Sequence, residues 1–542
     1  MSLRIKFKEN FHLFIPGLVL LIRLPQMLFP IRADAGYFAY TSWLISMGNV
    51  PYRDFFLSRT PLMQTINAIP MWALGSSVII PLVMETFIVA GSCLLIFYNI
   101  KYLSKDYWLS ITSSIVYALY ASKYSISAGG GATENYVVFF YMLALFFILK
   151  NDWTKPTISS SLLFGLSIGC AVLVRQIGII SIIVWSLFWV FTLEFKAIRV
   201  RILASYLTGI FVVIMIFFTF LFITDSFSNF LNIQLNFGTN YFATGVSGQG
   251  WIIGNLQLVG KILRQTVPLT PLIFVGLSQL DRKWLPIIVF GIAGTMETFI
   301  LGSTGYLHYA IIILPLLSIL AALGIRTIYS WAVQNNNDQR KKILIGFFTL
   351  LLILQPGLIM VSHISYVKKR ISQDLLGEGS FMENNFVLYR VASELRNQLN
   401  KEEFFAYWGY RQIIPILAQR RHLQQTPDLD WFTINSPKDS LDVKRSQFVS
   451  AIINENPKIV ILLTNLKRES ARPPEALVEL LSQRYELLGT YGPSSISVSG
   501  FSGYNDGSYE LWRLKTSNIL EKEIDDAKNV KREKSADQVE NL

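Results

Sequence analysis

Long apolar runs recur along the first two-thirds of the chain, and they constrain its fold more than any other feature. A helical run of about 18 residues or more spans the roughly 30 Å of hydrocarbon in a bilayer. The chain is 52% hydrophobic and only 15% charged, with a mean hydropathy of +0.41, so it has far more apolar material than one water-soluble core requires. The sequence therefore predicts a polytopic α-helical membrane protein.

We expect about eleven transmembrane helices from the length and spacing of these runs. The first run follows basic residues as a signal peptide would, but Arg23 interrupts it and no small-residue cleavage site follows, which favours a retained span. The expected spans are approximately 11–29, 78–99, 107–121, 134–149, 158–174, 177–193, 202–223, 267–280, 284–301, 308–325 and 343–363.

The basic residues of the loops indicate an orientation in the cell membrane. With the N-terminus in the cytoplasm, the inner loops hold about sixteen Lys and Arg residues and the outer loops before the C-terminal domain about seven. The net charge of +12 is then a positive-inside signal, and no nucleic-acid partner is expected. Cys93 and Cys170 both lie in apolar runs, which leaves no thiol pair outside the membrane for a disulfide or for zinc.

Two expected outer loops are unusually long, and long ordered connections often carry function. In the loop 31–77, amphipathic stretches at 37–47 and 62–74 are typical of helices lying along the membrane interface, or of a passive surface hairpin. The loop 224–266 is rich in Asn, Gly, Tyr and Gln, which indicates either a flexible lid that contacts substrate or a solvated linker.

The sequence divides into a transmembrane domain, 1–363, a small extracytoplasmic α/β domain, 364–514, and a charged tail, 515–542, expected to be disordered. Within the α/β domain, hydrophobic periodicity predicts helices and strands in alternation. The expected helices are 386–399, 413–419 and 475–484, and the expected strands are 404–408, 459–463, 485–491 and 508–514.

The first outer loop also concentrates polar side chains beside hydrocarbon. Asp34 lies at the mouth of the first span, where a carboxylate is costly unless it is paired or takes part in chemistry. A solvated Asp34, or one paired with Arg32, is the alternative. Several motifs in this region occur together: DAGYFAY at 34–40, GNVPYRDF at 48–55, RTPL at 59–62, GATENY at 131–136, and His308-Tyr309 with Leu314-Pro315.

With these motifs in this order, the chain resembles the GT-C glycosyltransferases that use polyprenyl-phosphate-linked sugars, in particular the branch of lipid A aminoarabinose transferases and protein O-mannosyltransferases. The resemblance covers roughly the first 325 residues and the general layout of the tail, and several matches at the expected places are more specific than one. It implies an inverting transfer of a hexosyl or pentosyl group from a polyprenyl-phosphate donor to a lipid, glycan or protein acceptor at the outer face.

The resemblance also implies roles for individual residues. Asp34 matches the catalytic aspartate, a general base for the acceptor hydroxyl, and Glu134 matches a second acid that orients the acceptor or helps to hold a cation. Glu134 can instead cap a helix N-terminus, and Arg175 can snorkel to headgroups. The residues expected to bind substrate, chiefly the donor phosphate, are Tyr37, Asp54, Arg59, Arg175, His308 and Tyr309.

Two positions depart from the family pattern. Ala35 replaces the second acid of the usual Asp-Glu pair, and Ser58 stands where relatives often have Glu or His. Both changes remove metal ligands, so we assign no cofactor and no metal site. The sequence neither supports nor excludes a requirement for a divalent cation. Arg59 replaces a family lysine, and its planar guanidinium suits a phosphate diester at least as well.

A transporter or translocase of lipid-linked sugars is the alternative to a transferase. A transporter is expected to have ionisable residues or Gly/Pro breaks near the middle of the bilayer in corresponding halves, whereas the charged candidates here gather at helix ends. A structural scaffold that displays the C-terminal domain leaves Asp34, Asp54 and Arg59 unexplained. The sequence does not identify the sugar, the prenyl length or the acceptor.

Overall fold

The computed structural model of the chain consists of two compact units, Met1–Leu376 and Gly377–Leu542. The structure describes residues 11–31, 33–127, 130–192, 196–235, 249–301, 306–334, 386–409, 413–423, 438–464, 473–492 and 508–515, with a few further residues between 346 and 383.

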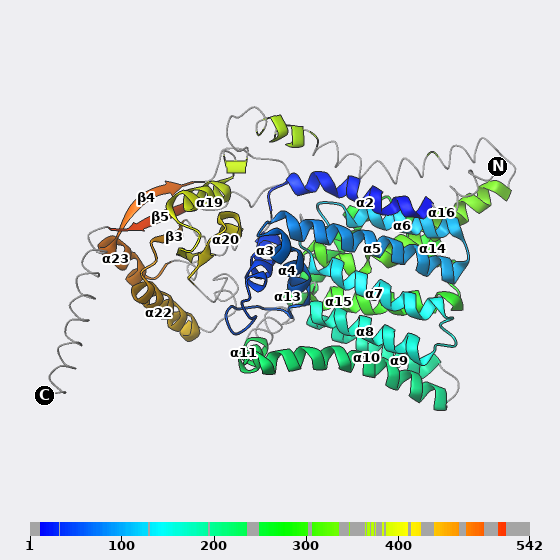
Figure 1. Cartoon of the computed structure of the whole chain (residues 1–542). Helices are drawn as coiled ribbons and strands as arrows, with labels where there is room; N and C mark the ends of the chain where they lie inside the picture. Colours follow the sequence, from blue (N-terminus) through cyan, green and yellow to red (C-terminus); the bar gives the residue numbers. More distant parts are fainter. Residues whose placement is uncertain are drawn as a thin grey trace. The chain divides into compact units, whose positions relative to one another are not determined.

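Apolar helices of different lengths run alongside one another in the first unit (Figure 1). Most are apolar around their circumference, as expected of helices that bury one side in protein and expose the other to lipid. Their bounds are α2 Ile15–Arg23, α5 Ile79–Ser104, α6 Tyr107–Ala121, α7 Thr133–Lys150, α8 Ile158–Val174, α9 Ile179–Thr192, α10 Lys196–Ile223, α14 Thr270–Leu277, α15 Leu285–Leu301 and α16 Leu314–Gln334. Short 3-10 turns connect or extend them: η1 Phe11–Phe14, η2 Leu24–Leu28, η3 Gln176–Gly178, η5 Arg282–Trp284 and η7 Leu307–Ile313.

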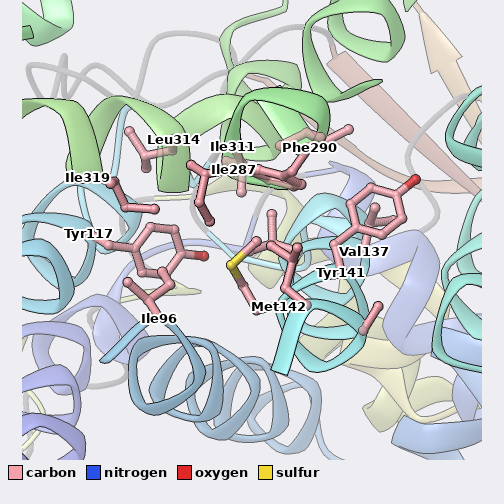
Figure 2. Close-up of a cluster of buried hydrophobic side chains, with 14 of the residues drawn as sticks. Ile96, Tyr117, Val137, Tyr141, Met142, Ile287, Phe290, Ile311, Leu314 and Ile319 are labelled. Atoms are coloured by element: carbon pink, nitrogen blue, oxygen red, sulfur yellow. The ribbon is translucent and has the colours of Figure 1, made fainter. Parts of the chain in front are cut away.

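The core of this unit lies between α5, α6, α7, α15, η7 and α16. Figure 2 shows part of it, where Tyr117 and Met142 face Ile287 and Ile311. Helices α8 and α10 approach even more closely, because a Cβ atom at Gly165 or Gly209 would overlap the backbone of the opposite helix. Close packing of this kind gives a rigid frame for the loops at the helix ends.

Five helical stretches in the described part of the chain are long and apolar enough to cross a membrane, and a bent pair makes six if it counts as one span. They are Ile79–Ser104, Thr133–Lys150, Ile198–Ile223, Arg282–Ile300 and Leu307–Ala332, with Trp251–Thr266 and Thr270–Leu277, bent by 99°, as the pair. Shorter apolar helices occupy His12–Leu28, Ile158–Val174 and Gln176–Thr192. The expected count of about eleven spans is thus not confirmed, and the eleventh, 343–363, lies outside the described residues apart from Gly346.

The two long connections contain helices. In the first, α3 (Ala33–Ser46) and α4 (Leu62–Leu74) lie at one end of the helix bundle, which we call the site end (Figure 1). In the second, α11 (Phe227–Ile233) and α13 (Gln249–Thr266) are helices, which the sequence did not predict, and 236–248 lie outside the described residues. Leu258 and Ile262 of α13 pack against η7, which explains the helix.

The second unit has a five-stranded mixed sheet in the order β2-β1-β3-β5-β4. Strands β1, β2 and β3 are parallel, whereas β5 is antiparallel to both β3 and β4. The strands are β1 Phe404–Trp408, β2 Arg421–His422, β3 Ile459–Thr464, β4 Tyr485–Tyr491 and β5 Ser508–Leu514, and the helices are α19 Val387–Gln398, α20 Ile413–Ala418, α22 Lys438–Glu455 and α23 Glu475–Arg484. The tail from 516 onward lies outside the described residues.

Candidate active site

Asp34 lies in the first turn of α3, at the site end of the bundle. Its side chain is exposed, and no described residue forms a hydrogen bond or an ion pair with it. A carboxylate is favoured in the first turn of a helix because it faces the positive end of the helix dipole. Arg32, the expected alternative partner, lies outside the described residues. Asp34 is therefore available to a ligand from this end of the bundle.

The connection between α3 and α4 is braced by its own side chains. The Tyr52 hydroxyl donates to the Arg59 carbonyl at 2.7 Å, and the Ser58 amide donates to the Tyr37 hydroxyl at 3.4 Å. Asp54 accepts from the Val50 amide at 2.7 Å and pairs with Arg53 at 2.8 Å, and these hydrogen bonds hold the pKa of its carboxyl below the ordinary value. Asp54, expected to bind substrate, thus orders the loop.

Arg59 points toward the start of α7. Its guanidinium donates to the Thr133 hydroxyl at 2.7 Å and lies 5.2 Å from the centre of the Phe38 ring. Phe38 follows Asp34 by one helical turn in α3, so Arg59 lies over the same helix that carries the carboxylate. The side chain is half-buried, which does not fit snorkelling into lipid headgroups. Among the described residues, Thr133 is the only hydrogen-bond acceptor of this guanidinium.

Glu134 and Arg175 form an ion pair that is almost completely buried, with side-chain exposures of 1% and 5%. The Thr133 hydroxyl donates to the other Glu134 oxygen at 3.3 Å. Arg175, the first residue after α8, also stacks over the Tyr309 ring at 4.6 Å. This geometry excludes both alternatives expected from the sequence, a solvated Glu134 cap and a snorkelling Arg175.

His308 and Tyr309 complete the group on η7. The Tyr309 ring is buried, and the His308 ring lies beside it with centroids 4.5 Å apart. A chain of contacts therefore connects most of the expected site residues. It runs in the order Arg59, Thr133, Glu134, Arg175, Tyr309 and His308.

Three buried charged residues near these side chains were not singled out as site candidates. Arg23 of α2 pairs with Glu85 of α5 at 2.9 Å, and Glu85 also accepts from the Gly131 amide just before α7. Glu297 of α15 accepts from the Tyr141 hydroxyl at 2.6 Å and from the Ser181 hydroxyl at 2.7 Å. Both acids lie inside apolar segments, where an ionisable side chain is rare and is by itself a sign of function, so the signal was present in the sequence.

Metal ligands are sparse in this region. Within the described part of the chain, no three His, Cys, Asp or Glu side chains lie close enough together to hold a metal ion. This end of the bundle carries one exposed carboxylate, two arginines, one buried acid and two aromatic rings. Such a group can bind an anion and accept a proton.

No protein-family model and no curated protein matches the sequence. The fold is similar to the crystal structure of ArnT from Cupriavidus metallidurans bound to undecaprenyl phosphate, with a TM-score of 0.59 and 13% identity over 94% of this chain and 98% of ArnT. The fold is also similar to the apo oligosaccharyltransferase of Archaeoglobus fulgidus, with a TM-score of 0.50 and 11% identity over 92% of this chain and 76% of the oligosaccharyltransferase. For the mycobacterial arabinofuranosyltransferase AftD, the TM-score is 0.51 and the identity is 11% over 94% of this chain and 40% of AftD.

All three of these enzymes belong to the GT-C superfamily, the one that the motifs of the first loop predicted. Identities of 11% to 13% are informative about the fold and not about the reaction. The chain is therefore a membrane protein with the GT-C glycosyltransferase fold.

Proposed function

We propose that the protein is a glycosyltransferase that moves a sugar from a polyprenyl-phosphate donor to an acceptor hydroxyl at the outer face of the membrane. The observation that carries the proposal is the exposed carboxylate of Asp34, which has no partner among the described residues, on the helix over which the Arg59 guanidinium lies. A base and a cation are the two groups that this transfer requires. The fold shared with ArnT, whose structure contains undecaprenyl phosphate, supports the choice of donor.

The proposed reaction is a single inverting displacement. Asp34 takes the proton of the acceptor hydroxyl, the acceptor oxygen bonds to the anomeric carbon, and the bond from that carbon to the phosphate oxygen breaks. Polyprenyl phosphate leaves with the electron pair, and Arg59 stabilises its increased negative charge by charge-assisted hydrogen bonds.

The substrates are found first by comparing envelope glycans and glycolipids, by mass spectrometry, in cells with and without the protein. A sugar that disappears identifies the donor and acceptor for a reconstituted assay. In that assay we expect Asp34→Asn to insert and fold normally, because the side chain has no described partner, and to lower turnover by about two orders of magnitude or more, the usual contribution of a positioned base.

Asp152→Asn is the matched control for this substitution. Asp152 is also an exposed aspartate, but it follows α7 at the end opposite to the site. The Asp152→Asn protein is therefore expected to turn over at the wild-type rate. Near-normal transfer by purified Asp34→Asn protein would remove Asp34 from the mechanism. Transport of the intact lipid-linked sugar across a vesicle membrane, with no sugar transferred, would favour the translocase instead.

A further inference from the structure

The Arg23–Glu85 pair is buried between four helices at the site end. Its side chains are 4% and 0% exposed, and the Arg23 guanidinium also donates to the Thr86 hydroxyl and to the Ala121 carbonyl, both at 3.3 Å. An ion pair in this position costs desolvation on both sides, and apolar replacements of the same volume often stabilise a protein equally well. Helix packing alone therefore does not explain the pair.

Glu85 uses its remaining acceptor capacity on the turn of residues 130–133 and on the first helical turn of α7 that follows it. It accepts from the Gly131 amide at 2.7 Å, from the Ala132 amide at 3.3 Å and from the Asn135 side-chain amide at 2.5 Å. These amides belong to the N-terminal end of α7, where backbone donors lack partners within the helix. Arg23 keeps the Glu85 carboxylate in place, and Glu85 in turn fixes the position of residues 130–133.

The turn lies directly against the helix that carries Asp34. At Gly131 the φ angle is +75°, and a Cβ atom there would lie 2.7 Å from the Ala35 Cα, so only glycine fits without displacing α3. The turn continues into Thr133, which holds the Arg59 guanidinium. One short turn thus contacts Ala35, the residue next to the proposed base, and accepts a hydrogen bond from Arg59, the residue proposed to bind the donor phosphate.

We propose that Arg23 and Glu85 are positioning residues for the transfer reaction: the pair clamps the turn 130–133 and thereby sets Asp34 relative to Arg59. The proposal rests on the proposed function for its catalytic meaning. A hydrogen bond also connects α7 to α4, the second helix of the first outer loop, because the Tyr136 hydroxyl donates to the Asn67 side chain at 2.7 Å. Displacement of the clamped turn by a fraction of an ångström is expected to slow chemistry more than binding.

The test replaces both charges, with Arg23→Met and Glu85→Met together, because a single Glu85→Gln change leaves Arg23 buried without its partner and endangers folding. We expect the double variant to fold and to bind undecaprenyl phosphate within about threefold of the wild type, with kcat lower by at least about tenfold. Arg23→Lys keeps a cation beside Glu85 and is expected to retain most of kcat, as rescue by the conservative change.

Asn99→Leu is the matched control. The Asn99 side-chain amide donates to the Met142 carbonyl at 2.9 Å, so it joins α5 to α7, as Glu85 does, but further along both helices, away from the site end. The variant is expected to keep kcat. An equal loss of kcat in Asn99→Leu, or normal kcat in the double variant, would overturn the proposal.

A second readout does not depend on transfer. Ala132 is 6% exposed, and in a background with Cys93→Ala and Cys170→Ala, an Ala132→Cys thiol is expected to resist a water-soluble maleimide. Adding the double replacement is expected to raise its labelling rate at least about tenfold, because the turn has lost its acceptors. Continued protection overturns the clamp. If the wild type transfers no sugar, the proposed function fails, and the labelling alone decides whether the clamp exists.

Discussion

Arg59 and Arg175 lie at the same end of the bundle, but their charges have different surroundings. Arg175 is buried and neutralised by the carboxylate of Glu134, so its charge is already compensated in the folded protein. Arg59 is half-buried, and its hydrogen-bond partner, Thr133, is neutral. No described carboxylate pairs with Arg59, so a ligand phosphate has this cation to itself among the described residues, whereas at Arg175 it must share the cation with Glu134.

Replacement of Arg59 tests this difference. Arg59→Ala is expected to weaken binding of undecaprenyl phosphate by about 1.5 to 3 kcal/mol, the range for a charge-assisted hydrogen bond, which corresponds to about tenfold to about 150-fold in Kd. Arg59→Lys is expected to recover part of the affinity, since it keeps the charge and loses the planar pair of donors. The measurement is a titration of purified protein in detergent or nanodiscs, and unchanged affinity in Arg59→Ala would mean that the guanidinium only braces Thr133.

The sequence indicated the residues of this site that belong to recognisable motifs, including the buried Glu134, Arg175 and Tyr309, and missed Arg23, Glu85, Glu297 and Thr133. Asp34 and Arg59 lie in one loop, within reach of a motif read along the chain. Arg23 and Glu85 are separated by 62 positions and meet only because α2 packs on α5, which no local pattern encodes. Thr133 is an ordinary helix-start residue in sequence, and its contact with Arg59 depends on the tertiary arrangement of α4 and α7.

At the scale of elements, the sequence predicted those whose pattern is set locally. Strands β1, β4 and β5 and helix α23 have the expected bounds, because the hydrophobic pattern that defines them lies within each segment. Strand β2 was missed because it is only two residues long and exists through its pairing with β1. Helix α13 was missed because its Gly and Gln content masks the few apolar residues that pack on η7.

Strand β2 contains a histidine whose protonation opposes folding. His422 is buried beside Phe405, and burial lowers the pKa of its imidazole to about 4 from the ordinary 6.5. The folded state disfavours the charged imidazole. The free energy of unfolding is therefore not reduced by His422 above pH 6.5, and it falls as the pH drops toward 4. The expected loss between pH 7 and pH 5 is about 2 kcal/mol.

Thermal unfolding of the full-length protein in detergent measures this loss. The melting of the sheet-containing unit is expected to shift to lower temperature at pH 5 in the wild type and to shift less in His422→Gln, which has no charge to gain. Equal shifts in the two proteins would assign the pH dependence to other groups.

At the scale of the whole molecule, the proposed reaction requires that the site end face away from the cytoplasm. Helix α5 begins at Ile79, close to α4, and ends at Ser104, so these two positions report opposite ends of the first unit. The Lys and Arg residues gather in the loops at the Ser104 end, among them Lys101, Lys105 and Lys150, which favours a cytoplasmic location for that end.

Single cysteines test the orientation in intact cells. In the background without Cys93 and Cys170, we expect a membrane-impermeant thiol reagent to label Met47→Cys, exposed at the end of α3, and Ser380→Cys, in the second unit. Ser104→Cys is expected to stay unlabelled until the cells are opened, because the basic loops keep that end inside. Labelling of Ser104→Cys alone in intact cells would invert the orientation, and the carboxylate of Asp34 would then face the compartment where soluble nucleotide sugars, rather than flipped lipid-linked ones, are the available donors.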